Sequence, residues 1–231
     1  MKSRTKPRIG IIGAGRLGTV IARQALAADY HVTIANSKKD PTSLRFILSV
    51  LLPGAEPATV QKVVEQSDII ILAIPLNKYQ QLPADVFAHK LVIDAMNYWP
   101  LTEGYRAEFE DDRTSSSEYI QGYLPHATVV KSLNHVAYNE IEEHSLPKGD
   151  PDRRAVLVAG DDVDAKRQVR DFIDDLGFDS VDLGDLKEGK KFQPGTELFN
   201  TRFRAQDLGE RESGAAILPI FVPQTDRHRQ R

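Results

Sequence analysis

The residues best suited to chemistry lie near the start of the chain, in a glycine-rich turn between two apolar stretches. Residues 9–12 are Ile-Gly-Ile-Ile, a short run that predicts a buried parallel strand. The next six residues form a complete G-x-G-x-x-G, and Leu17, Val20 and Ile21 then recur at helical spacing. Strand, glycine turn and helix therefore follow one another in the order that a dinucleotide phosphate site requires.

Each glycine of this turn has a separate task. Gly13 permits a tight turn, Gly15 lets the backbone approach a pyrophosphate, and Gly18 lets the helix pack closely on the strand. The phosphates would face unpaired N–H groups and the positive end of the helix dipole. Glycine turns also serve purely structural ends, so the prediction depends on the strand and helix that flank this one. The predicted pyrophosphate-binding residues are Gly13, Ala14, Gly15, Arg16, Leu17 and Gly18.

A basic loop follows the next predicted strand, residues 31–35, which closes a βαβ unit. An NAD site usually has Asp or Glu at this point to bind the ribose 2′-hydroxyl. Amide, hydroxyl and ammonium groups instead bind a 2′-phosphate, which a carboxylate would repel, so the loop favours NADP. The alternative is a solvated lysine pair in a turn, with Asp40 close enough to be its partner. The residues of this loop are Asn36, Ser37, Lys38 and Lys39.

Residues 67–75 predict the clearest buried strand, which ends at the carboxyl edge of the sheet, where ligands of open α/β sheets bind. We therefore expect Ala73, Ile74 and Pro75 to lie against the cofactor, although core packing explains them nearly as well.

Polar residues follow two later predicted strands at this same edge. Residues 91–94 lead to Asn97, an amide that binds either a ribose or the nicotinamide amide, or only holds its own turn. Tyr98 and Trp99 come next, and they either stack on a flat ligand or cap the core. Residues 127–131 form the other strand, which runs directly into a third polar loop.

This third loop supplies the candidate catalytic residues, Asn134 and His135. An imidazole titrates near neutrality and can protonate a reduced product, but a lone histidine in such a loop more often bonds backbone or solvent. Hydride transfer needs no ionising side chain when the acceptor is itself a redox cofactor. The lack of an obvious acid–base pair therefore favours a flavin-like acceptor over a carbonyl compound.

Composition excludes several other kinds of chemistry. The 231 residues include no cysteine, so there is no disulfide, thiol nucleophile or cysteine-ligated metal. No H-E-x-x-H, G-x-S-x-G or P-loop motif occurs, and no metal site is expected. The net charge of −3 gives no field that recruits nucleic acid or anionic membrane. Apolar runs are too short for a signal peptide or a membrane span, so we expect a soluble, cytoplasmic protein.

The order of elements predicts an α/β fold with a doubly wound, mostly parallel sheet of about eight strands. Strands are also expected at residues 155–159 and 178–183, and they extend the same sheet rather than begin a new domain. We assign residues 1–186 to a Rossmann dinucleotide-binding domain. Residues 187–231 form a C-terminal extension, with a short helix at 197–203, that packs on this domain or on a neighbouring subunit.

In combination, these motifs resemble the NADPH-dependent deazaflavin coenzyme (factor 420) reductase family. They are also similar to the cytosolic oxidoreductase domain of the six-transmembrane ferric reductases. The stretches that carry the resemblance are the glycine turn, Ile34-Ala-Asn-Ser-Lys38, Ile70-Ile-Leu-Ala-Ile-Pro75, Val92-Ile-Asp-Ala-Met-Asn97 and Val130-Lys-Ser-Leu-Asn134.

The resemblance implies an NADP-binding Rossmann fold, often dimeric, that passes hydride to a deazaflavin or flavin co-substrate stacked on the nicotinamide. By position, the three glycines would hold pyrophosphate, Ser37 and Lys38 the 2′-phosphate, and Asn97 and Asn134 would border the nicotinamide and acceptor pocket. The chain departs from the family in having Lys38 where arginine is usual and Tyr98-Trp99 directly after Asn97.

Two other functions stay open. One is reduction of an imine or carbonyl compound, as in pyrroline-5-carboxylate reductase, although the strands expected after residue 150 argue against the helical dimerisation domain of that family. The other is non-catalytic NADP binding. For each of these functions the expected partner is a small molecule. The expected assembly is a homodimer.

Overall fold

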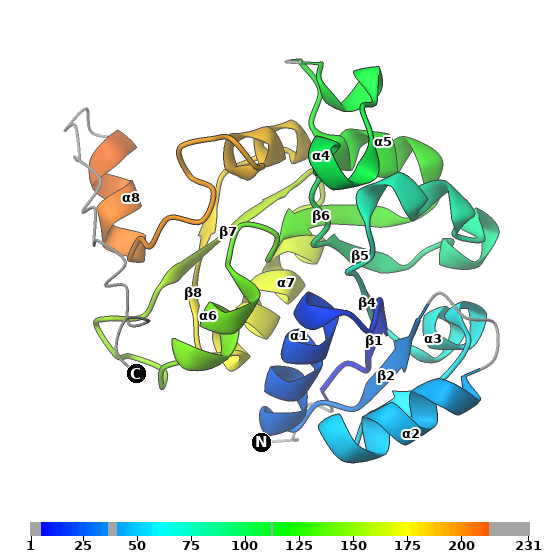
Figure 1. The fold of residues 1–231 in the computed structure, drawn as a ribbon. Coiled ribbons are helices and arrows are strands. Elements are labelled where there is room, and N and C mark those ends of the chain that lie inside the picture. Colours follow the sequence, from blue (N-terminus) through cyan, green and yellow to red (C-terminus); the bar gives the residue numbers. More distant parts are fainter. Residues whose placement is uncertain (1–5, 37–40, 112, 213–231) are drawn as a thin grey trace, which may run out of the picture.

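A computed structural model describes residues 6–36, 41–111 and 113–212 of the chain. The described residues form one eight-stranded sheet in the order β3-β2-β1-β4-β5-β6-β7-β8, with helices on both faces (Figure 1). The predicted doubly wound α/β fold is therefore confirmed. The strands are β1 (Ile9–Ile12), β2 (Val32–Ala35), β3 (Glu56–Pro57), β4 (Ile69–Leu72), β5 (Leu91–Asp94), β6 (Thr128–Ser132), β7 (Ala155–Gly160) and β8 (Asp179–Asp182).

The helices fall into two groups by the face of the sheet that they cover. Core residues of α1, α2, α6 and α7 pack together on one face, and those of α3, α5, η1 and η2 pack on the other. The α-helices are α1 (Arg16–Ala27), α2 (Thr42–Leu51), α3 (Val60–Gln66), α4 (Pro100–Glu103), α5 (Ser116–Tyr123), α6 (Tyr138–Glu143), α7 (Val163–Asp175) and α8 (Ala205–Glu212). The 3₁₀ helices are η1 (Leu76–Gln81), η2 (Ala84–Phe87), η3 (Ala107–Phe109) and η4 (Leu186–Phe192).

Two covered faces explain why the central strands are apolar along their whole length. In β4, Ile69 and Ile71 belong to one core cluster, whereas Ile70 and Leu72 belong to the other. Successive side chains of a strand point to opposite faces, and here both faces are covered. An apolar run without alternation is therefore the pattern that this position in the sheet requires.

One strand reverses the direction of the sheet. The pairs from β2 to β6 are parallel, but β7 runs antiparallel to β6, and β8 is parallel to β7. The carboxyl ends of β1, β2, β4, β5 and β6 consequently share one edge, and the carboxyl end of β8 lies at the other. From there η4 passes back over β7 and β6. Residues 193–200 thereby return to the edge that holds the glycine turn.

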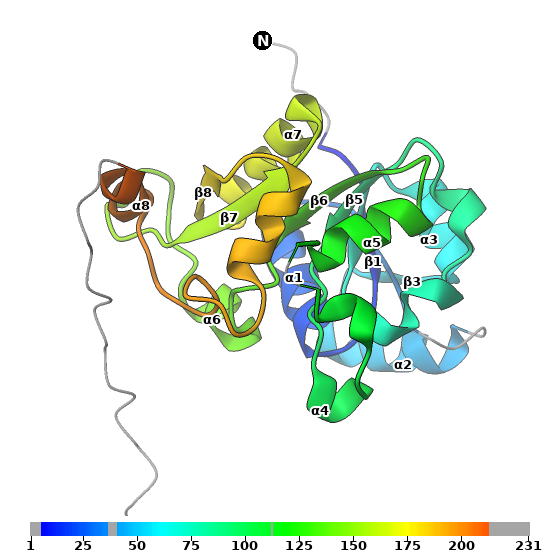
Figure 2. The same ribbon diagram turned by 90° about the horizontal axis from the view of Figure 1, so that it is seen from above.

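The helix expected at residues 197–203 is wrong, because α8 begins only at Ala205. Phe203 is buried, and its carbonyl accepts a hydrogen bond from the backbone N–H of Ala155 at the start of β7. The core cluster on β7 includes Phe192, Phe203 and Leu208. The segment that contains these residues therefore packs along β7. The domain boundary at residue 186 stays a prediction. Figure 2 shows α8 at the opposite end of the molecule from α2 and α3.

Within the described ranges, no helix is both long enough and apolar enough to cross a membrane.

Candidate functional site

The glycine turn between β1 and α1 is tightly packed at two of its glycines and open at the third. A Cβ added at Gly13 would lie 2.2 Å from the carbonyl oxygen of Ala73, and Gly13 has a φ of +125°. A Cβ at Gly18 would lie 1.8 Å from the carbonyl oxygen of Gly13. At Gly15, no described atom lies within 4 Å of the added Cβ. The open position is the one where a ligand's phosphates would approach the backbone.

The N-terminus of α1 suits an anion. Gly15 is the N-cap and has no side chain to occupy the first N–H groups, and the first turn carries no acidic residue. Arg16 follows, with one guanidinium nitrogen 3.3 Å from the hydroxyl of Tyr138 and its carbon 5.5 Å from the centre of that ring. Helix N–H groups and the helix dipole attract negative charge here, and Arg16 adds a full positive charge.

A cavity of about 790 Å³ lies at the carboxyl ends of β4, β5 and β6. Its size is within the range of small-molecule sites, and its lining is mainly apolar with several amides. The residues that line it are Leu17, Ala73, Ile74, Pro75, Asn77, Lys78, Ala95, Met96, Asn97, Trp99, Thr102, Glu103, Asn134, Val136, Ala137, Tyr138, Phe199 and Asn200.

A second cavity, of about 600 Å³, lies beside the first at the ends of β1 and β2. Ile74 and Lys78 line both cavities, so the two cavities are neighbours. Ile12, at the end of β1, lines the second cavity, and Leu17, in the first turn of α1, lines the first, so the glycine turn between them lies next to both. The second cavity is lined by Ile12, Asn36, Thr59, Val60, Gln61, Ile74, Lys78, Gln81, Leu82 and Pro83.

Two asparagines join the loops that follow β5 and β6 at the first cavity. We call these loops, residues 95–99 and 133–135, the exits of the two strands. The amide nitrogen of Asn97 donates to the backbone carbonyl of Asn134 at 2.7 Å, and the amide nitrogen of Asn134 donates to Asn97 Oδ1 at 3.0 Å. Asn134 donates a second bond to the carbonyl of Phe192. Asn134 Oδ1 is buried without a partner among the described residues. This oxygen is the one side-chain acceptor of the asparagine pair that no described residue satisfies.

A buried ion pair lies directly beneath these exits. Lys131 Nζ is 3.2 Å from Asp94 Oδ2, both side chains are fully buried, and Ser117 donates to the same carboxylate. Lys131 also donates to the carbonyl of Met96, and the N–H of Met96 donates to Asp94 Oδ1. Burial lowers the pKa of Lys131, while the charge of Asp94 opposes that shift. The pair thus fixes both backbone groups of Met96, one residue before Asn97.

His135 does not reach the cavity. Its side chain is 1% exposed, its Nε2 accepts a hydrogen bond from the N–H of Leu157, and its ring packs edge-to-face on Phe192. Burial, together with the nearby charges of Arg154 and Lys131, lowers the pKa of His135 to about 3. The imidazole is therefore neutral at physiological pH, and its Nδ1 is buried without a hydrogen-bond partner among the described residues.

Seven of the predicted site residues that the structure describes line at least one of the two cavities, and the rest of the glycine turn, Gly13, Ala14, Gly15, Arg16 and Gly18, lines neither. Asn97 and Asn134 line the first cavity and Asn36 lines the second, while His135 lies outside both. Ser37, Lys38 and Lys39 lie outside the described residues, so the predicted 2′-phosphate contacts stay a prediction. The remaining predicted residues that line a cavity are Leu17, Ala73, Ile74 and Pro75.

Several lining residues were not predicted from the sequence. Asn77 and Lys78 lie on η1, just past the point where the apolar run ends at Pro75. Tyr138 follows the polar loop of β6 by three residues, so a wider window after each strand would have found all three. Phe199 had no comparable signal, because it reaches the cavity from the far end of the chain.

The ionisable side chains of the first cavity's lining are Lys78, Glu103 and Tyr138. Glu103 accepts a hydrogen bond from the N–H of Asn77, and the hydroxyl of Tyr138 contacts Arg16. Among the described residues, no group of His, Asp or Glu is arranged to hold a metal ion.

Residues 8–98 match the model of a protein family described as "NADP oxidoreductase coenzyme F420-dependent". The metalloreductase STEAP3 of Rattus norvegicus is 28% identical over 191 residues, which cover 81% of this chain and 36% of the relative. The chain thus spans about a third of the length of that curated relative.

Two solved structures are similar over most of their length. A hypothetical protein from Sinorhizobium meliloti is 28% identical, with a TM-score of 0.73, over 85% of this chain and 95% of that one. A putative F420-dependent NADP reductase from Arthrobacter is 25% identical, with a TM-score of 0.67, over 80% of this chain and 87% of that one. The resemblance inferred from the motifs is therefore confirmed: the chain is similar to F420-dependent NADP reductases and to STEAP metalloreductases, and residues 8–98 carry the match to the NADP oxidoreductase family.

Proposed function

We propose that this protein is an NADP-dependent oxidoreductase that transfers a hydride between the nicotinamide and a deazaflavin or flavin-type acceptor stacked on it. In the direction of NADPH oxidation, NADPH, the oxidised acceptor and one proton yield NADP⁺ and the reduced acceptor. The glycine turn and Arg16 bind the pyrophosphate, and the second cavity takes the adenosine half. The first cavity takes the nicotinamide and the acceptor ring.

The observation that carries the proposal is the character of the first cavity's lining. Amides and apolar side chains border the exits of β5 and β6, and the single histidine of these loops is buried away from the cavity. These two loops orient a ring and bring no ionisable side chain to the cavity. The ionisable side chains of its lining, Lys78, Glu103 and Tyr138, come instead from η1, α4 and α6. An acceptor that is itself a redox ring needs only this kind of support.

Asn97 and Asn134 position the nicotinamide in this proposal. Asn97 holds Asn134 through two hydrogen bonds, so the unpartnered Oδ1 of Asn134 has a fixed direction. A carboxamide N–H is a suitable donor to it. Lys78 lines both cavities and therefore lies where a negatively charged linker between them would pass.

Tyr138 supports a second candidate function, the reduction of an imine or carbonyl compound. Tyr138 lines the first cavity, its hydroxyl accepts a hydrogen bond from the Arg16 guanidinium, and a phenol can donate a proton to a reduced product. Non-catalytic NADP binding is the third candidate function. In that case Asn97 and Asn134 only fix the two loops relative to each other.

Steady-state oxidation of NADPH with a panel of acceptors separates these functions. Turnover with flavins or deazaflavins, and with no other acceptor, supports the proposal. Turnover with cyclic imines, abolished in Tyr138→Phe, supports the second candidate. Tight NADPH binding by calorimetry without turnover of any acceptor supports the third. A homodimer stays a prediction that sedimentation of the purified chain will test.

The preference for NADP has its own test in the basic loop. Replacing Lys38 with Asp and Lys39 with Ala should lower NADPH affinity at least about tenfold and spare NADH, because one charged hydrogen bond contributes about 1.5–3 kcal/mol. The dissociation constants of both dinucleotides are measured by calorimetry. Equal losses for NADPH and NADH would refute the 2′-phosphate assignment.

A further inference from the structure

Trp99, the only tryptophan of the chain, lies in the wall of the first cavity and remains 46% exposed. Its ring contacts Phe199 edge-to-face, with the ring centres 5.8 Å apart and an interplanar angle of 74°. The two residues come from distant parts of the chain, one from the exit of β5 and the other from the segment between η4 and α8. We call them the aromatic pair.

Core packing explains the position of Tyr98, the residue before Trp99, but it does not explain the exposed ring of Trp99. Tyr98 is 9% exposed, its hydroxyl donates to the carbonyl of Gly104, and the same oxygen accepts from the N–H of Arg106. Tyr98 therefore anchors this loop to the protein. Trp99 leaves much of a large apolar ring facing outward from the same loop. Burial of that surface by a ligand would be favourable.

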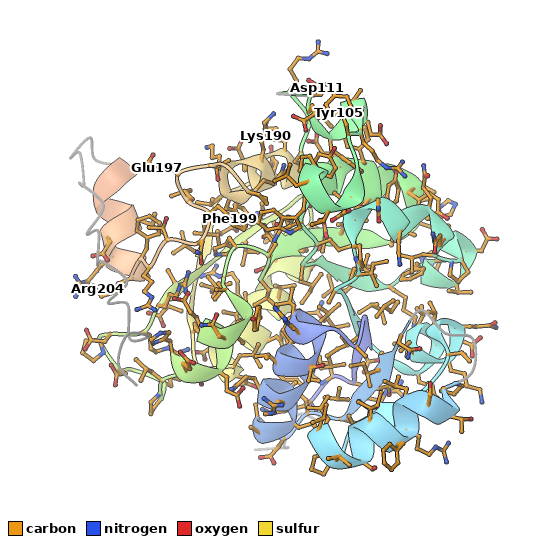
Figure 3. All side chains as sticks on the ribbon, viewed as in Figure 1. Tyr105, Asp111, Lys190, Glu197, Phe199 and Arg204 are labelled. Carbon is orange, nitrogen blue, oxygen red and sulfur yellow. The ribbon has the colours of Figure 1, made fainter. Side chains whose placement is uncertain are left out.

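The segment that carries Phe199 is tied to the exit of β6. The carbonyl of Phe192 accepts from Asn134, and the N–H of Asn200 donates to the carbonyl of His135 at 2.9 Å. In Figure 3, Phe199 lies nearer the middle of the molecule than Glu197 and Arg204, which lie toward its outer edge. Phe199 is thus held at the cavity by the loop that carries Asn134.

We propose that the aromatic pair, Trp99 and Phe199, binds the planar ring of the hydride acceptor and selects for flat aromatic acceptors. Residues 193–200 then belong to the acceptor site, and the dinucleotide site is complete without them. The inference rests on the proposed function for the identity of the acceptor. It depends on three observations: an exposed tryptophan, an aromatic partner from another segment, and an apolar cavity between them and the glycine turn.

Fluorescence of Trp99 provides a direct test, because no other tryptophan contributes to the emission. The protein is saturated with NADP⁺ and titrated with riboflavin, and the quench is corrected with free tryptophan amide at the same riboflavin concentrations. We expect saturable quenching whose dissociation constant agrees with equilibrium dialysis. Riboflavin that binds by dialysis without quenching Trp99, or that does not bind at all, overturns the proposal.

Variants then test the pair itself. Phe199→Leu keeps an apolar side chain but removes the ring, and Trp99→Ala removes the platform. Each should weaken riboflavin binding about tenfold, the equivalent of roughly 1.4 kcal/mol, and leave NADP⁺ affinity within about twofold. Trp99→Phe should restore most of the affinity. The matched control is Leu101→Ala, two residues away on α4 and fully exposed, which should change neither affinity.

Failure of this inference can be told apart from failure of the proposed function. Riboflavin binding that depends on Phe199, without any NADPH oxidation, supports the aromatic pair and contradicts the proposed activity. NADPH oxidation by flavins with a KM unchanged in both Phe199→Leu and Trp99→Ala supports the activity and overturns the pair. Circular dichroism melting curves confirm that each variant is folded before it is assayed.

Discussion

The edge of the sheet that carries the two cavities is held in shape by different means on its two sides. On the glycine side, residues 13–18 and 73–75, backbone packs directly on backbone without side chains between them. On the polar side, residues 94–99 and 131–135, side chains bond to the backbone of the loops. The first side therefore tolerates no added atom at Gly13 or Gly18, whereas the second tolerates no lost hydrogen bond.

The difference agrees with what each side would bind in the proposed function. A pyrophosphate needs bare N–H groups at close range, and only glycines allow that approach. A ring and a carboxamide instead need walls and directed amides, which loops provide only when something fixes them. The ion pair of Asp94 and Lys131 does this for the exit of β5, and the asparagine pair joins that exit to β6.

The largest effect is expected on the polar side, from Lys131→Met. Removing the ammonium leaves Asp94 buried with only Ser117 and one backbone N–H, which should lower the free energy of unfolding by about 3–5 kcal/mol. Chemical denaturation measures the loss. Adding Asp94→Asn to the variant should recover part of it. The control, Lys187→Met, breaks the exposed pair with Asp185 and should cost no more than about 1 kcal/mol.

On the glycine side, Gly18→Ala and Gly15→Ala should separate stability from binding. The Cβ at Gly18 meets a backbone oxygen at 1.8 Å, so α1 must shift, at a cost of about 3 kcal/mol in unfolding free energy. The Cβ at Gly15 meets no described atom, so stability should stay within about 1 kcal/mol while NADPH affinity falls at least about tenfold. Equal stability losses in both variants would contradict the distinction between packed and open glycines.

The burial of His135 predicts a pH effect that distinguishes a structural group from a catalytic one. Its pKa in the folded protein is about 3, below the 6.5 of a free histidine, so the unfolded state binds the extra proton. Its contribution to stability is therefore complete above pH 6.5 and is lost as the pH falls toward 3. The stability advantage over His135→Gln should shrink by about 2 kcal/mol between pH 7 and pH 5.

Denaturation curves of the two proteins at several pH values measure this difference. Turnover of His135→Gln at neutral pH should stay within a few fold of the unmodified protein. A loss on the order of 10²–10⁴ in turnover, with an unchanged stability profile, would instead identify His135 as a general acid.

The smallest effect on stability is expected from the N-cap of α5, the helix that carries Ser117. Ser115 accepts from the N–H of Glu118 and donates to the carbonyl of Leu186, so it joins α5 to η4. Ser115→Ala should cost about 1 kcal/mol. Glu118→Gln keeps an acceptor for the N–H of Ser115 and should cost less than about 0.5 kcal/mol, as measured by thermal denaturation. A Glu118→Gln variant as unstable as Ser115→Ala would contradict this assignment of the cap.

Much of the glycine side was predictable because its signals are local. The apolar runs of β1 and β4, the spacing of the glycines and the helical periodicity of α1 all lie within a few residues of the atoms that they position. The capping box of Ser115 with Glu118 and the N-cap of Asp162 are equally local. Each depends on contacts between neighbours in sequence, which a single chain displays directly.

The polar side was predicted only as a set of residues, not as an arrangement. Leu133 has a φ of +64°, a conformation that a leucine rarely adopts, and it lies between the end of β6 and Asn134. The backbone therefore turns at a residue with no local signal for it, and Asn134 lines the cavity while His135 is buried against β7. The reversal of β7 was equally hidden, because an apolar run has the same composition in either direction.

The sequence by itself thus determined the fold class, the glycine turn between β1 and α1 and the choice of amides at the strand ends, because glycine spacing and apolar periodicity act over short range. Tertiary structure alone decided that His135 is buried and that Phe199 reaches the cavity, more than sixty residues from Asn134. Both outcomes depend on how distant segments pack over β6 and β7. That packing is settled by the burial of Phe192 and Phe203 and by hydrogen bonds to the β6 exit, which no local pattern records.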